Sequence, residues 1–338
     1  MRCVASLLIV ALLAGTASLR AQTLKGWTKG KGFGWVWGSQ DETGALNAIL
    51  TPERILKAMQ RVEKGKVYDL GVPLDQFSYK FAGHSPTSIV SYRSPEGIKR
   101  GGDIPGMGEG HKKKMGFHSC ALYISDNLGT QIDGLGHITV GDDNHWYNGF
   151  KESDWGGDFG VRKADAEGIP PVIGRAVLID VAAQQGVDAL PSNFAITSKE
   201  LQAALAAQKM DVEPGDIVFV RTGTLRYWGA NGSDHAKIAQ HDSAGLALDG
   251  AKWLVEQKGA VMIGGDTSGV EVGQDPALPG AVNPVHEYLL VEQGIHLGEF
   301  HNLEELSRNK VYRFTYVAMT NRLIGTVAGT ALRPIAIE

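Results

Sequence analysis

The residues best suited to chemistry in this chain lie in one glycine-rich segment, from Asn127 to His137. The segment also holds the carboxamide Gln131, the carboxylate Asp133 and the hydroxyl of Thr130. Side chains of these types bind hard or borderline divalent metals, and the intervening glycines let the backbone fold so that they converge. The spacing therefore predicts a metal-binding or catalytic site, with a polar turn as the alternative on these residues alone.

Strands and helices that alternate through the C-terminal two-thirds of the chain would position this segment. Apolar runs beside turn residues predict buried strands at 175–180, 217–221 and 260–263, and a last strand is expected at 311–319. Periodic segments predict helices at 201–209, 251–257 and 284–294. Thr197 and Glu200 form a capping box before the first helix, and Asn283 is placed to cap the last. This alternation predicts one α/β domain with a mixed sheet over residues 22–338.

The N-terminal residues are typical of an export signal. Arg2 precedes an apolar run at 4–14 that is too short to span a bilayer, and Ala21 offers a small residue for cleavage. We therefore expect residues 1–21 to be a signal peptide and the mature protein to be periplasmic or secreted; a buried N-terminal helix is the alternative. The formal net charge of −4 gives no electrostatic reason to expect nucleic acid or an anionic membrane as a partner.

Two further segments carry expectations of their own. Cys120 would be the one cysteine of the mature chain and begins an apolar run, which predicts a buried strand cysteine rather than a nucleophile. Residues 101–116 contain six glycines together with Lys112, Lys113 and Lys114. This composition predicts a loop that is either a solvated excursion or a lid or partner-contacting arm.

At Gly129-Thr130-x-x-Asp133-x-x-x-His137 the chain resembles the metal-dependent cyclase/hydrolase family, which includes bacterial kynurenine formamidase and isatin hydrolase. The signature of that family is His-x-Gly-Thr-His-x-Asp-x-Pro-x-His. Four other stretches resemble family motifs in the same order, at 37–47, 214–223, 266–268 and 286–303. The resemblance implies an α/β fold of the swivelling β/β/α type with a mixed sheet. It also implies a homodimer or homotetramer that hydrolyses amide, lactam or lactone bonds with zinc or manganese.

Four residues match site positions of that family. Asp133, His286 and Glu299 match metal-binding positions, and His137 matches a histidine that serves as a ligand or proton-transfer group. The resemblance therefore implies catalytic roles for His137, Asp133 and Glu299. His286 falls in the first turn of the predicted helix, where the helix dipole disfavours imidazolium and favours the neutral ring that a ligand needs.

Two family histidines are replaced in this chain, by Asn127 and Gln131. A carboxamide binds zinc far more weakly than imidazole does, whereas manganese tolerates amide oxygens better. We therefore expect one divalent ion, manganese or zinc, on the four matching residues with Gln131 as a weak ligand, or no metal at all. His118 and His301 are candidates for the missing imidazoles, with surface positions as the alternative.

The residues allow three functional hypotheses, each with a small molecule as the partner. The first is a metal-assisted hydrolase of a small cyclic or aryl amide, lactam, lactone or ester. The second is a metal-independent lyase, isomerase or cyclase with Asp133 and His137 as acid and base. The third is a non-catalytic exported binding protein. Five side chains are expected to contact the small molecule: Asn127, Thr130, Gln131, Trp146 and Tyr147.

Overall fold

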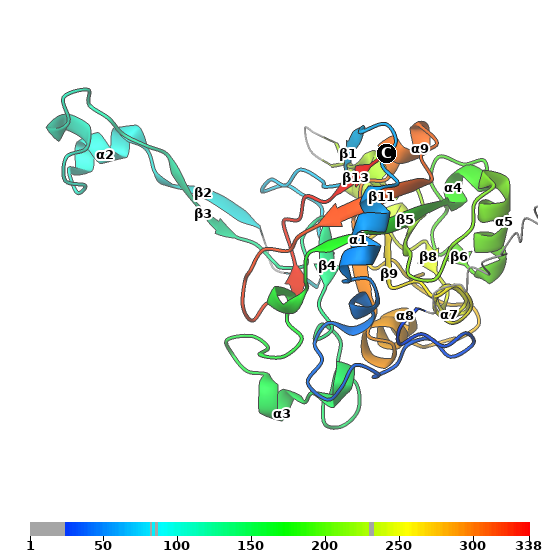
Figure 1. The fold of residues 1–338 in the computed structure, drawn as a ribbon. Helices are drawn as coiled ribbons and strands as arrows, with labels where there is room; N and C mark the ends of the chain where they lie inside the picture. The colour runs from blue at the N-terminus through cyan, green and yellow to red at the C-terminus, as the bar shows by residue number, and fades with distance from the viewer. Residues whose placement is uncertain (1–23, 82, 85–86, 230–232) are drawn as a thin grey trace, which may run out of the picture.

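A curled mixed sheet forms the centre of the protein in the computed structural model, which describes residues 24–81, 83–84, 87–229 and 233–338 (Figure 1). The strands of the described residues are β1 (Val67–Asp69), β2 (Ser88–Arg93), β3 (Ser119–Tyr123), β4 (Gln131–Asp133), β5 (Val172–Asp180), β6 (Ala195–Ile196), β7 (Ile217–Arg221), β8 (Gly245–Leu246), β9 (Met262–Gly265), β10 (His296–Glu299), β11 (Arg313–Ala318), β12 (Ala328–Gly329) and β13 (Ile335–Ile337). Nine of them form the main sheet, in the order β1-β13-β11-β5-β7-β9-β10-β4-β12. The mixed α/β fold predicted from the sequence is confirmed.

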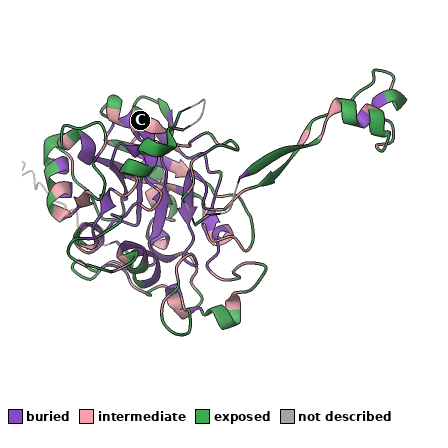
Figure 2. Cartoon of the chain, turned by 180° about the vertical axis from the view of Figure 1, so that it is seen from behind, coloured by how far each residue is buried: buried purple, intermediate pink, exposed green. Residues whose placement is uncertain are grey.

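The middle of the sheet is parallel and its flanks are antiparallel. β5, β7, β9 and β10 run in one direction, whereas β11 pairs antiparallel with β5, and β4 pairs antiparallel with β10. β5, β7 and β9 are mostly apolar because both faces of the sheet are covered there. Val177, Val218, Phe219 and Ile263 are all fully buried. Figure 2 shows that the centre of the body is buried.

The helices surround this sheet. They are α1 (Pro52–Met59), α2 (Pro95–Gly101), α3 (Glu152–Trp155), α4 (Val181–Gln184), α5 (Ser198–Gln208), α6 (His235–His241), α7 (Leu248–Lys252), α8 (Pro284–His286) and α9 (Glu304–Arg308). α7 and α8 continue as π-helical turns at Trp253–Gln257 and Glu287–Glu292, so the three predicted helices are all present. The capping box of Thr197 and Glu200 is formed. Asn283 precedes α8, but its side chain accepts no capping hydrogen bond from the described residues.

One segment, residues 88–123, extends away from the body of the molecule (Figure 1). We call it the arm; it consists of β2 and β3, paired antiparallel, with α2 and a 3₁₀ turn at Gly108–Gly110 towards its tip. Most of its residues are exposed, as the green colour in Figure 2 shows. Cys120 lies on β3 and is exposed, so the prediction of a strand was right and that of burial was wrong. The apolar residues of β3 belong to a two-stranded sheet outside the core, which is why their pattern did not indicate burial.

Two features bear on membranes and export: the helices of the described residues and the N-terminal segment. None of their helices combines the length and the apolar character that crossing a bilayer requires. Residues 1–21, which the sequence predicts to be a signal peptide, lie outside the described residues.

Candidate active site

Two neighbouring strands bring the candidate residues together. β4 follows the arm directly and pairs antiparallel with β10, so that Gln131 lies opposite Glu299. Asp133 lies two residues further along β4 and therefore on the same face of the sheet as Gln131. The chain enters β4 through Gly129, which has a φ of 64° and would place a Cβ only 2.5 Å from Leu74. A glycine at this position therefore lets the backbone pass close to Leu74 and turn into β4, as expected of the glycines in this segment.

The side-chain amide of Gln131 lies at the centre of the site and is fully buried. Its Nε2 donates to Oε2 of Glu299 at 2.7 Å. The same nitrogen lies 3.0 Å from Oδ1 of Asn127 and 3.1 Å from Oδ1 of Asp133. Three oxygen atoms therefore share two N–H hydrogens. Gln131 thus bonds to the other carboxamide, Asn127, and to the carboxylates of Asp133 and Glu299.

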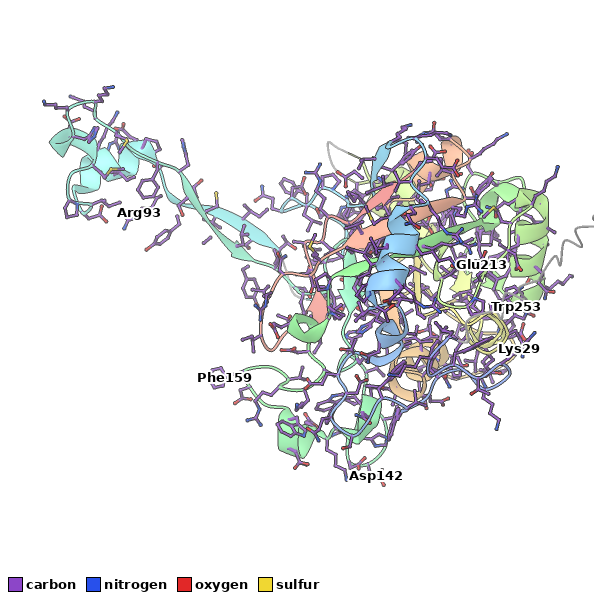
Figure 3. All side chains as sticks on the ribbon, in the orientation of Figure 1. Lys29, Arg93, Asp142, Phe159, Glu213 and Trp253 are labelled. Carbon is purple, nitrogen blue, oxygen red and sulfur yellow. The ribbon has the colours of Figure 1, made fainter. Side chains whose placement is uncertain are left out.

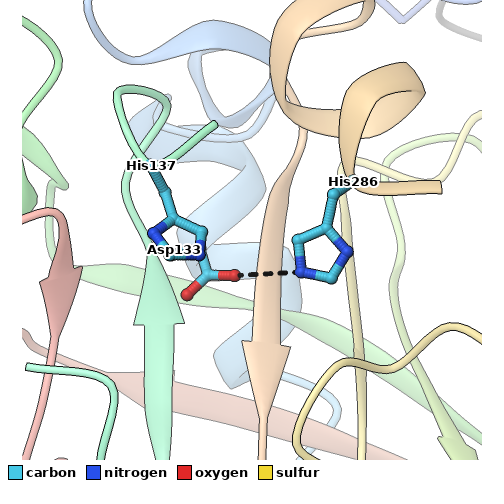
Figure 4. Close-up of side chains that lie close together, drawn as sticks. All are labelled: Asp133, His137 and His286. Carbon is cyan, nitrogen blue, oxygen red and sulfur yellow. Dashed lines mark ion pairs between the residues drawn. The ribbon is translucent and has the colours of Figure 1, made fainter. Parts of the chain in front are cut away.

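Asp133, His137 and His286 form a candidate metal site (Figure 4). One donor atom from each lies within 4.8 Å of the other two, and Asp133 Oδ2 is 3.9 Å from His286 Nε2. Asp133 Oδ2 and His137 Nδ1 are buried without a hydrogen-bond partner among the described residues. A buried carboxylate oxygen in that condition is costly, and a divalent cation would satisfy it. The donor set of one carboxylate and two imidazoles therefore fits a divalent metal ion.

Glu299 lies beside this cluster rather than within it. Its Oε1 is 3.5 Å from Nε2 of His286, while its Oε2 accepts the hydrogen bond from Gln131. Burial, reinforced by the nearby charge of Asp133, raises the pKa of Glu299 above the usual range of a glutamate. A carboxyl with a raised pKa can hold and release a proton near neutral pH.

Glu271, which the sequence analysis missed, orients His286. Its Oε1 accepts the Nδ1 hydrogen of His286, and its Oε2 accepts the N–H of Val285 at 2.9 Å. This arrangement leaves Nε2 of His286 directed at the other acids of the site. Burial alone would lower the pKa of His286, but hydrogen bonds to Glu271 and Glu299 outweigh it and raise the pKa. The acids around this ring therefore favour its charged form, whereas a divalent ion bound at Nε2 would require the neutral ring that the sequence predicted.

A cavity of about 480 Å³ opens over the site, a volume suited to a small organic molecule. Its lining includes four of the predicted residues: Asn127, His137, His286 and Glu299. It also includes residues outside the predicted set, among them Tyr79, Phe81, His84, Asp242, Ser268 and Glu271. Burial, followed by the proximity of His137, lowers the pKa of His84, so this ring is neutral at neutral pH. His84 belongs to none of the family motifs, and no spacing in the sequence pointed to it.

Of the five side chains expected to contact the small molecule, Asn127 lines the cavity, Gln131 is fully buried and does not line it, and the other three lie elsewhere. Thr130 Oγ1 accepts the N–H of Val72 at 2.9 Å and donates to the carbonyl oxygen of Phe300 at 2.7 Å. Trp146 and Tyr147 are buried and donate their polar hydrogens to groups outside the cavity. The structure therefore places these three side chains in the packing around the site rather than in its cavity.

Neither candidate for the missing imidazoles reaches the site. His118 is exposed at the start of β3 on the arm. His301 is fully buried, and its Nε2 is 2.8 Å from the hydroxyl of Tyr316. Burial lowers the pKa of His301 to about 3, so it is a neutral packing residue.

Comparison with known proteins gives one family and several similar structures. Residues 68–272 match the family model "Putative cyclase". A crystal structure described as a novel cyclase is 28% identical with a TM-score of 0.74, covering 89% of this chain and 98% of that chain. No match is found among curated proteins.

Two isatin hydrolase A structures share the fold at lower identity. One comes from Labrenzia aggregata, bound to benzyl benzoate, and is 18% identical with a TM-score of 0.55, covering 81% of this chain and 94% of that chain. The other comes from Ralstonia solanacearum and is 18% identical with a TM-score of 0.57, covering 80% of this chain and 91% of that chain.

Proposed function

Because the chain belongs to the cyclase family, we propose that it is a metal-assisted hydrolase of a small cyclic or aryl amide, lactam, lactone or ester. One observation carries the proposal. Donor atoms of Asp133, His137 and His286 converge within 4.8 Å beneath a cavity of about 480 Å³. A buried acid and two imidazoles with converging donor atoms are typical of a divalent metal site, and they are not typical of a packed core.

Asp133, His137 and His286 would hold the ion, zinc or manganese. When bound, the ion supplies polarisation of a substrate carbonyl and a lowered pKa for a coordinated water. Glu271 keeps Nε2 of His286 facing the cluster, because Nδ1 is committed to the Glu271 carboxylate. Gln131 keeps the carboxylates of Asp133 and Glu299 close without letting them repel each other directly.

Proton transfer is assigned to Glu299. Hydrolysis breaks a C–N or C–O bond, adds a hydroxyl to the carbonyl carbon and delivers a proton to the leaving nitrogen or oxygen. Glu299 lines the cavity and has a pKa raised by burial, so its carboxylate can take a proton from water and return it to the leaving atom. His84, a neutral imidazole on the cavity wall, is a second proton acceptor within the same cavity.

Substrate size and character follow from the cavity wall. Tyr79 and Phe81 supply aromatic surface, while Asn127 and Ser268 supply hydrogen-bonding groups. This mixture suits a small ring that carries a carbonyl group. The aromatic and hydrogen-bonding residues of this wall support the expectation of a small cyclic or aryl substrate. Trp146 does not line the cavity and adds no support.

A second candidate function, a metal-independent lyase, isomerase or cyclase, is supported by Gln131. Its Nε2 lies among oxygens of Asn127, Asp133 and Glu299, where it stabilises the acids without an ion. Glu299 would then exchange protons directly with the substrate. The two functions differ in their products, because hydrolysis adds one water and isomerisation adds none.

The test is an assay of the full chain in isotopically labelled water. Protein is stripped with a chelator, reloaded with manganese or zinc, and offered aryl amides, lactams, lactones and aryl esters. We expect ion-dependent turnover and products that carry one labelled oxygen, detected by mass spectrometry. Protein that retains neither ion and releases no labelled product would overturn the hydrolase; turnover to products of unchanged mass would favour the second candidate.

A matched pair of variants locates the ion. Asp133→Asn is expected to abolish both ion retention and turnover, because it removes the anionic ligand atom. Asp188→Asn makes the same chemical change on an exposed surface carboxylate and should alter neither. Equal ion retention in the two variants would place the ion elsewhere.

A further inference from the structure

A second cavity, of about 50 Å³, is bounded by α1, by β5 and by the turn at 213–216 that precedes β7. It shares no lining residue with the cavity over the candidate active site and is therefore separate from it. α1 packs on the sheet here, because the hydroxyl of Thr315 on β11 donates to the carbonyl oxygen of Ala58 at 2.7 Å (Figure 1). Figure 3 shows Glu213, from that turn, on the side of the body away from the arm, which Arg93 marks.

Four cationic side chains line this cavity. Arg54, Lys57 and Arg61 follow one another at intervals of three and four residues, so they share one face of α1 and its C-terminal end. Arg175 comes from β5. Gly215 fixes the place of one of the four: its φ is 97°, and a Cβ there would lie only 2.7 Å from Nη1 of Arg54. The guanidinium of Arg54 therefore packs against the turn before β7.

The two acids of the lining do not balance these charges. Glu213 Oε2 lies 3.8 Å from Nη2 of Arg61, and its Oε1 pairs with Nη1 of Arg175. Asp216 Oδ1 is 3.5 Å from Nε of Arg175. The other two cations of the lining form no ion pair with a described residue. Four cations against two acids leave the lining with a formal charge of +2.

Arg175 lacks good hydrogen-bond acceptors although its side chain is only 10% exposed. Its Nε and Nη1 have no hydrogen-bond partner among the described residues, because neither Glu213 nor Asp216 meets them with hydrogen-bond geometry. A buried guanidinium in that condition is costly, and a further anionic acceptor beside it would stabilise it. Arginine presents its N–H groups in a planar fork that fits the oxygens of carboxylates and phosphates.

The size of the cavity selects the ligand. One water requires about 10–15 Å³, so about 50 Å³ holds roughly three to five groups the size of an oxygen atom. That number fits the four oxygens of a tetrahedral oxyanion, whereas pockets for drug-sized molecules begin at about 300 Å³. We propose that this cavity binds a phosphate or sulfate group through its four cations. Glu213, whose side chain is 53% exposed, competes with the anion for two of them.

The first test is a calorimetric titration of the full chain with inorganic phosphate, at an ionic strength held constant with chloride. We expect saturable binding, and the double variant Arg54→Gln with Lys57→Gln to weaken it at least about tenfold, because two charged donors are lost. The matched control is Lys99→Gln with Arg100→Gln, which makes the same two changes on α2 of the arm. A full chain that does not bind phosphate, or equal weakening by the two double variants, would overturn the proposal.

Glu213→Gln tests the site in the opposite direction. Removing this competing acid should tighten phosphate binding by about two- to fivefold, which corresponds to the usual contribution of an exposed ion pair. A gain of affinity cannot arise from a variant that has misfolded, so this result is independent of any damage in the α1 variants. Weaker or unchanged binding would contradict the proposal, because Glu213 would then not face the anion.

Selenate locates the anion, because its selenium scatters X-rays anomalously. Crystals of the protein soaked in selenate should show an anomalous peak between α1 and β5, and a saturated soak with no peak there would sink the proposal. A parallel titration with phenyl phosphate separates two sources of the same group. Tighter binding than inorganic phosphate supports the site as a receptor for the head group of a larger molecule, and weaker binding supports it as a site for the free ion.

Discussion

Gln131 and Glu299 lie opposite each other on β4 and β10 and are joined by a hydrogen bond of 2.7 Å from Nε2 to Oε2. The bond keeps a buried glutamate beside the buried carboxylate of Asp133. Two such acids would otherwise face each other with little between them, which raises the pKa of at least one. The amide thus contributes part of the stabilisation that a cation would give at the same position.

Replacing this amide by imidazole should change the affinity for metal. We expect Gln131→His to bind zinc about tenfold more tightly or better, since imidazole is a much stronger zinc ligand than a carboxamide. Competition with a chromophoric chelator measures the affinity. Gln202→His, which adds an imidazole to the exposed surface of α5, is the control. Equal zinc affinity for both variants and the parent chain would mean that residue 131 does not face the ion.

Removing the charge of Glu271 should change both the pKa of His286 and the affinity of the site for a metal ion. Glu271→Gln is expected to lower the pKa of His286, since the hydrogen bond to Glu271 is the largest contribution that raises it. It should also weaken ion binding by about 10- to 100-fold, as changes around metal-binding histidines commonly do. A nuclear magnetic resonance titration of the imidazole protons reports the first effect without any assay of turnover. Glu292→Gln, on an exposed glutamate, should leave the titration unchanged.

Thr130 should matter for stability rather than for substrate affinity. Thr130→Val removes a hydroxyl that serves Val72 and Phe300, leaving two buried backbone groups unpaired. We expect the free energy of unfolding to fall by about 2–4 kcal/mol, measured by urea denaturation. The exposed Thr139→Val is the control. A variant of unchanged stability with a raised KM would instead place this hydroxyl on the substrate.

Asp216 should make stability depend on pH. Burial raises its pKa to about 7, even though Arg175 lies 3.5 Å away. The folded protein therefore holds this proton more tightly than the unfolded chain does between pH 3.8 and 7. The contribution of this proton to the free energy of unfolding is fully present below the pKa of the unfolded state. It is lost as pH rises through the pKa of the folded state, by at most about 1.4 kcal/mol per pH unit.

The variant Asp216→Asn isolates that contribution. Urea denaturation across the same pH range should show a smaller fall in stability for the variant than for the parent chain. Asp188→Asn, on a side chain that is 81% exposed, should follow the parent. Parallel curves for parent and Asp216→Asn would show that the buried carboxyl is already ionised throughout.

Periodicity and end signals predicted the central elements well. β5, β7 and β9 are mostly apolar runs, and an apolar run is what burial on both faces of a sheet requires. The same signal failed at Cys120, because the apolar strand β3 lies outside the core on the arm. A local pattern shows which residues are apolar. It does not show whether another part of the chain packs against the strand and buries them.

The site was predictable only where its residues lie in a motif. Asp133 and His137 are four positions apart, so their convergence follows from local backbone. Glu271 and His84 reach the site through the fold, and the one sequence signal for Glu271 was a carboxylate between two buried valines. The acids that surround His286 are also set by the fold: hydrogen bonds to Glu271 and Glu299 raise the pKa of this histidine, which no pattern near residue 286 indicated.

The antiparallel register of β4 and β10 has a consequence for how such a site can diverge. The separation of Gln131 from Glu299, and the position of Asp133 beside them, are set by backbone pairing rather than by the side chains themselves. Substitutions at 127 and 131 can therefore exchange one set of donor atoms for another while the strands stay in place. A scaffold of this kind tolerates trial changes in ligand chemistry, whereas a one-residue insertion in β4 would turn Asp133 away from the site.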